Sequence, residues 1–300
     1  MTDFTSRVYS DPQDVQRMID VLRAVRPGKC MADYPGIADL QELMGIADIR
    51  AKTRLWFDGQ ERPVAFAFIN PPNNLAYEYD GREKNASIVD EIMVWGEQCT
   101  DEIALDTCCR EEDAERKAHL LGQGFVEQPG STWHMVRPLS ELIPDPVFLA
   151  GFRIRAVSGV DEAEALAELH RAAFGTPGMT TESRLAMMRV PEYDPAGDLV
   201  VIAPDGSLAA YLMCWISEAE NHITGRKDGH TDPVATCPAY QRLGLARALL
   251  LTGLRLLKAR GMDTARLGTS STNIAMQRVA RSVGFRVDYI SAWYRRSIAR

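Results

Sequence analysis

The stretch CPAYQRLGLARALLLTGLRLLKARG, residues 237–261, places small and basic residues immediately before and inside the first turn of a leucine-rich helix. The first N–H groups of a helix lack intrahelical partners, and together with the helix dipole they favour an anion such as a phosphate. Gly244 and Ala246 would let that anion approach the backbone, and Arg242 and Arg247 would add positive charge. The alternative is that the two small residues only ease packing of the helix on a sheet.

The elements expected around this stretch are a strand followed by a helix. HTDPVATCP, residues 230–238, is typical of a short strand that ends at a proline. The segment does not match a dinucleotide fingerprint, because GxGxxG is absent. Helical spacing then places one apolar face on Ala246, Leu249, Leu250, Gly253, Leu254 and Leu257.

The chain carries an internal repeat. Gly-Phe at 124–125 is followed eight residues later by Trp133, and Gly-Phe at 284–285 is followed eight residues later by Trp293. An amphipathic segment precedes each pair, so both patterns predict a helix, a glycine near its C-cap and then a pair of strands. The helices are expected at 114–121 and 273–283.

Matching hairpin signals extend the repeat toward the start of each half. One hairpin is expected to turn at Asp58-Gly59 and the other at Asp205-Gly206. The proline-rich segment RPLSELIPDPVFLAG, residues 137–151, has the composition of a linker. The sequence therefore predicts two copies of one α/β unit, in residues 1–140 and 151–300.

The two copies differ in charge and in the length of the segment that holds the phosphate-binding motif. The net charge is −11 for residues 1–150 and +4 for residues 151–300. From the hairpin glycine to the Gly-Phe pair, the second copy is 13 residues longer. The first copy has acids in place of the small residues, and we expect these acids to form a surface that repels a phosphate, so any chemistry on an anionic ligand is expected in the second copy. These acids are Glu78, Asp80 and Glu83, with Asp90 and Glu91 further along.

Composition excludes several classes of protein. A net charge of −7 argues against binding to nucleic acid. No run of 18 apolar residues is present, and the polar N-terminus argues against a signal peptide, so we expect neither membrane association nor export. The six cysteines form no CxxC pair, which favours reduced thiols in a cytoplasmic protein without a metal site. They are Cys30, Cys99, Cys108, Cys109, Cys214 and Cys237.

The second half resembles the GNAT acetyltransferase superfamily. Gln241-x-x-Gly244-x-Ala246 stands where that family has its pyrophosphate loop, and ARLGTSSTN followed by a helix ending in Gly-Phe keeps the family order. The resemblance implies an acetyl-CoA-binding GNAT domain at 151–300 and a degenerate GNAT-like copy at 1–140. The nearest pattern is the tandem-GNAT group that includes mycothiol synthase. The fold class implied is mixed α/β, with a mixed, mostly antiparallel sheet flanked by helices in each domain.

The resemblance also implies where acetyl-CoA would bind. The cofactor would lie in a V-shaped opening between the strand at 234–236 and the strand at 265–269. The backbone of the first strand would hold the pantetheine arm, and the N–H groups of residues 242–247 would hold the pyrophosphate. The residues implied are Val234, Ala235, Thr236, Gln241, Arg242, Leu243, Gly244, Leu245, Ala246, Arg247 and Asn273.

The reaction implied is direct attack of an amine on the thioester carbonyl, with a backbone N–H near residue 234 or 235 polarising the oxygen. An alkyl amine of lysine-like pKa is almost entirely protonated at pH 7, so a base is useful. His230 and Asp232 are the candidates, because residues two apart on a strand face the same side. Each has an alternative role, His230 as a solvated loop residue and Asp232 as a turn residue before Pro233.

Four further positions qualify this expectation. Asn273 stands at the family's CoA-contacting asparagine, but it could equally cap a helix. Ala280 stands where many members carry a tyrosine that donates a proton to the leaving thiolate. Tyr294 could replace that tyrosine or pack in a strand. Cys237 could accept an acyl group, although a small buried residue is the simpler interpretation.

Three functions remain open at this point. The first is an N-acetyltransferase that acts on a primary amine of a small molecule. The second is a non-catalytic acyl-CoA-binding regulatory module, and the third is acetylation of a protein N-terminus or lysine. The loss of a tyrosine at position 280 favours the module, and the pair His230 and Asp232 favours the enzyme. Neither the amine nor the oligomeric state follows from the sequence.

Overall fold

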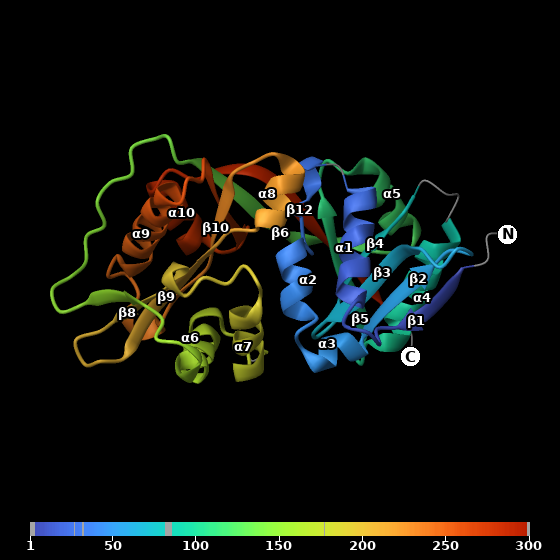
Figure 1. The fold of residues 1–300 in the computed structure, drawn as a ribbon, viewed down its shortest axis with the longest axis horizontal. Helices are drawn as coiled ribbons and strands as arrows, with labels where there is room; N and C mark the ends of the chain where they lie inside the picture. The colour runs from blue at the N-terminus through green and yellow to red at the C-terminus, as the bar shows by residue number, and fades with distance from the viewer. Residues whose placement is uncertain (1–3, 27, 32, 82–85, 177, 299–300) are drawn as a thin grey trace. The chain divides into compact units, whose positions relative to one another are not determined.

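The computed structural model describes residues 4–26, 28–31, 33–81, 86–176 and 178–298 (Figure 1). The chain divides into two compact units. Unit 1 is Met1–Pro129 with Ala292–Arg300, and unit 2 is Gly130–Ser291. The strands of the two units are paired in the same order, as the internal repeat predicts.

Unit 1 contains a mixed sheet in which β1, β2, β3 and β4 pair antiparallel and β4 pairs parallel with β5. Its strands are β1 (Thr5–Val8), β2 (Thr53–Phe57), β3 (Pro63–Asn70), β4 (Asn74–Tyr79) and β5 (Ala104–Arg110), together with the end of β12 (Arg286–Ser297). Its helices are α1 (Asp14–Val25), η1 (Gly28–Cys30), α2 (Ile37–Leu43), α3 (Ala47–Ala51), α4 (Ala86–Cys99) and α5 (Ala114–Gly122).

Unit 2 repeats this topology. Strands β7 to β10 pair antiparallel in chain order, β10 pairs parallel with β11, and β11 pairs antiparallel with β6. The strands are β7 (Arg153–Ala156), β8 (Asp198–Ile202), β9 (Leu208–Trp215), β10 (Asp228–Thr236), β11 (Thr264–Ser270) and β6 (Val126–Pro138). The helices are η2 (Val160–Glu162), α6 (Ala163–Phe174), α7 (Thr181–Arg189), η3 (Pro195–Gly197), α8 (Glu218–Thr224), η4 (Pro238–Tyr240), α9 (Leu245–Ala259) and α10 (Ile274–Ser282).

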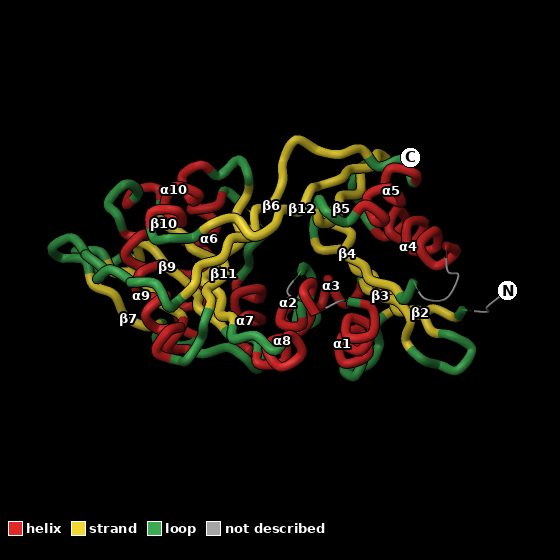
Figure 2. Tube along the Cα trace, turned by 90° about the horizontal axis from the view of Figure 1, so that it is seen from above, coloured by secondary structure: helices red, strands yellow, loops and turns green. Residues whose placement is uncertain are grey.

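Two long strands change the predicted organisation. Each Gly-Phe pair is followed by one continuous strand, β6 or β12, and not by the predicted pair of strands (Figure 2). Gly130, near the middle of β6, makes no turn there. The part of β6 from Gly130 belongs to unit 2, and the part of β12 from Ala292 belongs to unit 1. The compact units therefore differ from the ranges 1–140 and 151–300, because each half of the chain gives its last strand residues to the other unit.

Two clusters of apolar side chains cover the two faces of the unit 2 sheet. On one face, leucines of α9 pack against Leu212, Ala265 and Leu267. On the other face, residues of α6 pack against Tyr211 and Ala235. The predicted apolar face of α9 is confirmed, since all its members are buried except Ala246, which is partly buried. The alternation of strand residues therefore decides which side chains meet α9 and which meet the opposite face.

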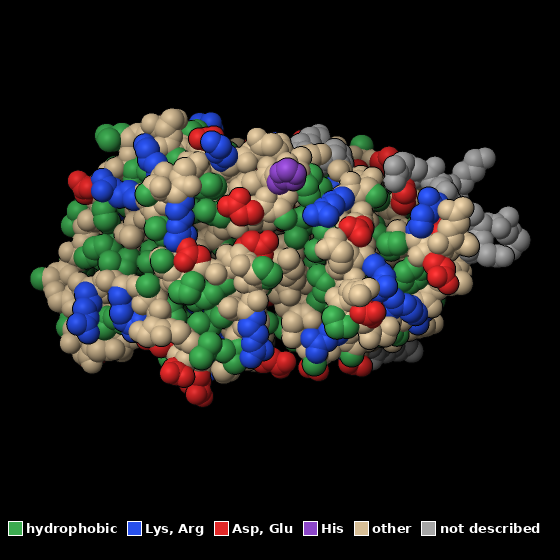
Figure 3. Space-filling model, in the orientation of Figure 1, with side chains coloured by type: hydrophobic (Ala, Val, Ile, Leu, Met, Phe, Trp, Pro, Cys, Tyr) green, Lys and Arg blue, Asp and Glu red, His purple; other side chains and the backbone are tan. Residues whose placement is uncertain are grey.

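Figure 3 shows acidic and basic side chains interspersed on the face that it draws. Among the described helices, none is long and apolar enough to cross a membrane. All six cysteines are free thiols.

Close packing of α9 on the sheet depends on Gly253. A Cβ at this position would lie 2.6 Å from the Cys214 sulfur and 2.7 Å from a methyl of Leu212. We expect Gly253→Val to lower the free energy of unfolding by about 1–3 kcal/mol through overpacking, measured by urea denaturation. Gly122→Val, at a helical glycine with open space around it, is the control. Equal effects of the two substitutions would contradict the packing argument.

Candidate active site

The two central parallel strands of unit 2 separate part-way along their length. Strands β10 and β11 are paired from Asp228↔Thr264 to His230↔Arg266. Beyond that point, among the described residues, β10 pairs only with β9 and β11 only with β6. The Thr231 hydroxyl donates to the Arg266 carbonyl oxygen at 3.0 Å where the separation begins. The sheet therefore has an opening between residues 231–236 and residues 267–270.

A bulge in β10 lies directly at this opening. Between Thr231, which pairs with Cys214, and Val234, which pairs with Leu212, two residues stand opposite one residue of β9. A bulge reverses the side-chain alternation of the strand that carries it. After the bulge Val234 packs toward the α9 face and Ala235 is buried on the α6 face. The extra residue therefore places Asp232 at the start of the opening.

The opening leads along β10 to an uncapped helix N-terminus. Residues 241–244 are exposed, and the backbone is left-handed at Arg242 (φ 62°) and at Gly244 (φ 78°). In this fully described segment, no side chain caps α9 and no acid occupies its first turn. A Cβ on Gly244 would meet nothing within 4 Å. The first N–H groups of α9 therefore face accessible space, as a phosphate site requires.

Two arginines reinforce this positive end. Within the described part of the chain, neither Arg242 nor Arg247 has a carboxylate partner. The loop before them is anchored by Tyr240, whose hydroxyl bonds the Asp205 carboxylate at 2.9 Å and the Ser207 hydroxyl at 2.8 Å. The site thus has uncompensated positive charge on a fixed loop, which suits a diphosphate.

His230 lies against Trp215 on the face opposite α9. The two rings are stacked, with centroids 3.7 Å apart and an interplanar angle of 11°. Burial lowers the pKa of His230 to about 3, and the neighbouring charges of Arg266 and His134 act in the same direction. The imidazole is therefore neutral throughout the physiological range, and its protonation would not produce a change in rate near pH 7.

Asp232 lies across the start of the opening. Its Oδ2 accepts a hydrogen bond from the backbone N–H of Gly268 on β11 at 3.1 Å, and its carbonyl oxygen accepts one from Trp215 Nε1 at 3.2 Å. The structure therefore brings both predicted base residues to Trp215. Sequence reasoning missed Trp215, although its position opposite His230 follows from the pairing of β9 with β10.

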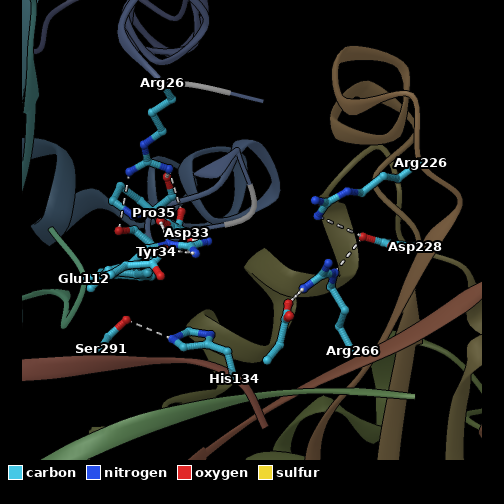
Figure 4. A network of polar contacts seen from close by, with 12 residues as sticks. Arg26, Asp33, Tyr34, Pro35, Glu112, His134, Arg226, Asp228, Arg266 and Ser291 are labelled. Carbon is cyan, nitrogen blue, oxygen red and sulfur yellow. Dashed lines mark hydrogen bonds and ion pairs between the residues drawn. The ribbon is translucent and has the colours of Figure 1, made fainter. Parts of the chain in front are cut away.

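Arg266 supplies a fixed positive charge beside His230. Its Nε donates to Asp228 at 2.6 Å and its Nη1 donates to Asp288 at 3.1 Å (Figure 4). Burial alone would lower the pKa of Arg266, but the two aspartates raise it above its ordinary value. This network was also missed, because nothing in the spacing of the sequence brings β10, β11 and β12 together.

Comparisons with known proteins agree with this geometry. Residues 163–285 match the Acetyltransferase (GNAT) family. A tandem GNAT protein from the clavulanic acid biosynthesis pathway has a TM-score of 0.73 at 14% identity, over 100% of this chain and 99% of that chain. This chain has the tandem GNAT fold. A GCN5-related N-acetyltransferase from Sphaerobacter thermophilus has a TM-score of 0.68 at 18% identity, over 99% of this chain and 96% of that chain.

A curated relative is the mycothiol acetyltransferase of Thermobispora bispora. It is 29% identical over 184 residues, which are 60% of this chain and 62% of the relative. The chain therefore spans less than two thirds of the length of the relative that it matches. The predicted tandem GNAT fold, with a mixed sheet in each copy, is confirmed.

Each of the four further positions singled out in the sequence has a defined packing or capping role. Asn273 Oδ1 accepts from the Met276 N–H at 3.0 Å, so Asn273 caps α10. Ala280 is fully buried in the core beneath α9 and α10. Tyr294 is fully buried in the core of unit 1, which agrees with a packing role. Cys237 packs against the cluster on the α6 face.

The GNAT opening of unit 1 has a different structure. From Asn74, opposite Asn70, to Tyr77, opposite Ala67, β4 keeps a continuous register and has no bulge. Strand β4 therefore has one residue fewer than β10 over the same number of partners. Tyr77 is the counterpart of Val234 by this pairing.

The side chain of Arg116 occupies the unit 1 opening. Its Nη2 donates to the Tyr77 carbonyl oxygen at 2.8 Å, and its guanidinium lies over the Tyr77 ring, 4.3 Å from the centroid. Nη1 donates to Glu78, which also pairs with Arg26 at 2.7 Å. Burial alone would raise the pKa of Glu78, but the two arginines lower it. Glu78 is thus a buried, neutralised acid, contrary to the expectation of a repelling surface charge, and Glu83 lies outside the described residues.

The depressed pKa of His230 predicts a pH effect on stability. The unfolded chain takes up a proton below about pH 6.5, whereas the folded imidazole does so only near pH 3, so the free energy of unfolding falls as the pH falls through this window. We expect His230→Gln to reduce this pH dependence, measured by urea unfolding between pH 4 and pH 7. His170, whose pKa burial lowers to about 4, keeps its own contribution of the same sign. An unchanged slope in the variant would contradict the assignment.

Proposed function

We propose that the chain is an acetyl-CoA-dependent N-acetyltransferase acting on a primary amine of a small molecule, with its active site in unit 2. One observation carries the proposal: β10 leaves β11 at His230 and leads directly to the uncapped N-terminus of α9. An extended ligand with a thioester at one end and a diphosphate nearer the other would use both features. The separated strands would receive the thioester arm, and the helix N-terminus would receive the diphosphate. The name of the mycothiol acetyltransferase relative supports the reaction class and a small-molecule acceptor.

Acetyl-CoA would be held by backbone along most of its length. Residues 242–247 would bind the pyrophosphate through the first N–H groups of α9, with Arg242 and Arg247 compensating its charge. The backbone of Val234, Ala235 and Thr236 would bind the pantetheine arm, in place of the strand pairing that β11 no longer provides. A backbone N–H beyond the bulge would stabilise the oxyanion that forms during attack. The residues implied on the loop are Gln241, Arg242, Leu243, Gly244, Leu245, Ala246 and Arg247. The side chain of Asn273 caps α10, and its contact with the cofactor stays a proposal.

The acceptor amine would approach from the face opposite α9. Asp232 lies there at the start of the opening, where its carboxylate can attract an ammonium group. The neutral His230 and the Trp215 ring form an adjacent aromatic surface. Because the amine attacks directly, no covalent enzyme intermediate is needed, and Cys237 has no catalytic role in this proposal.

Departure of the thiolate would proceed without a tyrosine at position 280. The side chain of Ala280 is a methyl group, which has no proton to donate, and it is fully buried. A CoA thiol has a pKa similar to that of cysteine, about 8.5, which makes its thiolate a moderate leaving group. The non-catalytic acyl-CoA-binding module is the rival interpretation of this loss, and acetylation of a protein N-terminus or lysine is a further alternative. The polar cluster beside the opening favours an enzyme over the module.

The function and the pyrophosphate loop can be tested together. We expect purified protein to release thiol from acetyl-CoA in the presence of some members of a panel of primary amines, including amino sugars, polyamines and a peptide with a free N-terminus. Gly244→Val should abolish acetyl-CoA binding and thiol release, because its side chain would occupy the space that a phosphate needs.

Gly225→Val is the matched control, since Gly225 is also left-handed (φ 66°), has open space around it and lies at the end of α8. It should carry a similar backbone strain of about 1–2 kcal/mol and keep full affinity. Acetyl-CoA binding without thiol release for any amine would favour the regulatory module. Acetylation of the peptide alone would favour the protein-directed alternative.

Unit 2 should provide the one acetyl-CoA site of the chain. In the unit 1 opening, the Arg116 guanidinium donates a hydrogen bond to the Tyr77 carbonyl oxygen. Strand β4 also lacks a bulge like the one in β10. Calorimetric titration of the full chain should therefore give a stoichiometry near one, and Gly244→Val should reduce it to zero. A stoichiometry near two would contradict the proposal that unit 1 is a degenerate copy.

A further inference from the structure

Gly268 leaves an uncovered place in the centre of the unit 2 sheet. It lies on β11, between β10 and β6, yet it is exposed. A Cβ at Gly268 would meet only Asp232 Oδ2, at 3.5 Å, which is an ordinary contact. Its neighbour Leu267 points to the α9 core, so the exposed side of Gly268 is the opposite face. A small group can therefore lie on the backbone of Gly268 beside the start of the opening.

Two polar side chains flank this place from the neighbouring strands. Asp232 of β10 bonds the Gly268 N–H, and His134 of β6 is paired directly opposite Gly268. Directly opposed residues of an antiparallel pair share one face of the sheet. A Cβ at Gly268 would lie 3.5 Å from Asp232 Oδ2, and the Cβ of a directly opposed residue such as His134 lies about 4.5–5.5 Å away on the other side, so the missing side chain of Gly268 leaves room for a small group between the two. An amine could lie between them.

The ring of His134 has a fixed orientation. It is stacked on Tyr289, with centroids 4.1 Å apart and an interplanar angle of 8°, and its Nε2 lies 3.1 Å from the Ser291 hydroxyl. Tyr289 and Ser291 are both on β12 (Figure 4 shows the pair formed by His134 and Ser291). Packing and a hydrogen bond that fix an imidazole prepare it for proton transfer.

We propose that His134 is a catalytic base that takes the proton from an acceptor ammonium bound over Gly268 beside Asp232. The inference rests on the proposed acetyltransferase function. The ammonium loses one proton to the imidazole, and the neutral amine then attacks the thioester carbonyl carbon. The C–N bond forms, the C–S bond breaks and the electron pair leaves with the CoA sulfur. The amide nitrogen releases its second proton to the thiolate or to water, and the imidazolium returns its proton to solvent.

This residue comes from the first half of the chain. The predicted boundary at residue 140 assigns His134 to the other copy, whereas β6 from Gly130 onward belongs to unit 2. The first half would therefore contribute to the reaction although its own opening is filled. Among the described titratable groups, Tyr289 of β12 stacks on His134, and His230 of β10 interacts with it electrostatically. Arg266 of β11 lies beside His230 and pairs with Asp228 and Asp288, and Asp232 bonds the Gly268 N–H.

The first test compares His134→Gln with the wild type in the amine-dependent thiol-release assay. We expect kcat to fall about 10²–10⁴-fold, the acidic limb of the rate profile to disappear, and the affinity for acetyl-CoA to stay unchanged. Added imidazole should partly restore the rate of His134→Ala, which a purely structural role would not allow. His222→Gln, at an exposed histidine of α8, is the control.

The second test puts a larger side chain into the space over Gly268, where the ammonium group is proposed to bind. Gly268→Val should raise the KM for the amine at least tenfold and leave acetyl-CoA affinity and folding intact, because no strained backbone and no core contact is involved. Gly59→Val, at an exposed glycine of unit 1 with open space around it, is the control.

Failure of the His134 proposal and failure of the proposed acetyltransferase function give different results. If the wild type releases thiol and His134→Gln keeps both its rate and its acidic limb, His134 is not the base and this inference is wrong. The same holds if loss of rate in His134→Ala is accompanied by loss of acetyl-CoA affinity and is not rescued by imidazole. If the wild type releases no thiol with any amine, the proposed function fails first, and the role of His134 fails with it.

Discussion

The site depends on one constraint, the separation of two parallel strands in the middle of a sheet. Strands β10 and β11 stop pairing after His230 and Arg266, so backbone groups that would normally satisfy each other are available to a ligand. The bulge that follows His230 turns the strand, and the Asp232 carboxylate receives the Gly268 N–H across the gap. The apolar residues of α9 pack against one face of these strands. The polar side chains beside the opening lie on the opposite face.

The two copies differ by one residue at the strand that borders this opening. Unit 1 has the same strand order. Opposite the same number of partner residues, however, β4 has one residue fewer than β10. The Arg116 side chain binds the Tyr77 carbonyl, and Glu78 is neutralised between two arginines. The Tyr77 carbonyl of unit 1 is bonded within that unit, whereas residues 231–236 of unit 2 pair only with β9 among the described residues. The last strands are exchanged between the halves of the chain, so the first half supplies β6 from Gly130 onward to unit 2.

Sequence patterns predicted the local features of this site well. The helix start at Leu245, the exposed loop before it and the end of β10 before Pro238 follow from short-range rules on proline, glycine and apolar spacing. The two Gly-Phe pairs revealed the duplication. The sequence could not show that each pair is followed by one long strand, because the partner of β6 lies more than 120 residues away along the chain.

Long-range features were also beyond the sequence. Trp215 and Arg266 lie beside His230 because of strand pairing, and Asp228 forms an ion pair with Arg266, so their place in the site was missed. Burial also gives His230 a pKa too low to titrate near pH 7, which its position in the sequence does not reveal. Glu78 was expected on the surface, because an alternating strand pattern cannot reveal that Arg26 and Arg116 approach from two different helical regions.

Hydrogen–deuterium exchange with and without acetyl-CoA tests the central claim most directly, because the claim concerns which backbone amides a ligand engages. The account predicts slower exchange on addition of acetyl-CoA in two segments of unit 2, the strand residues 231–236 and the loop and helix start at 241–247, with no change at residues 75–81 of unit 1. Protection confined to unit 1, or no protection in either segment of unit 2 at saturating acetyl-CoA, would contradict it.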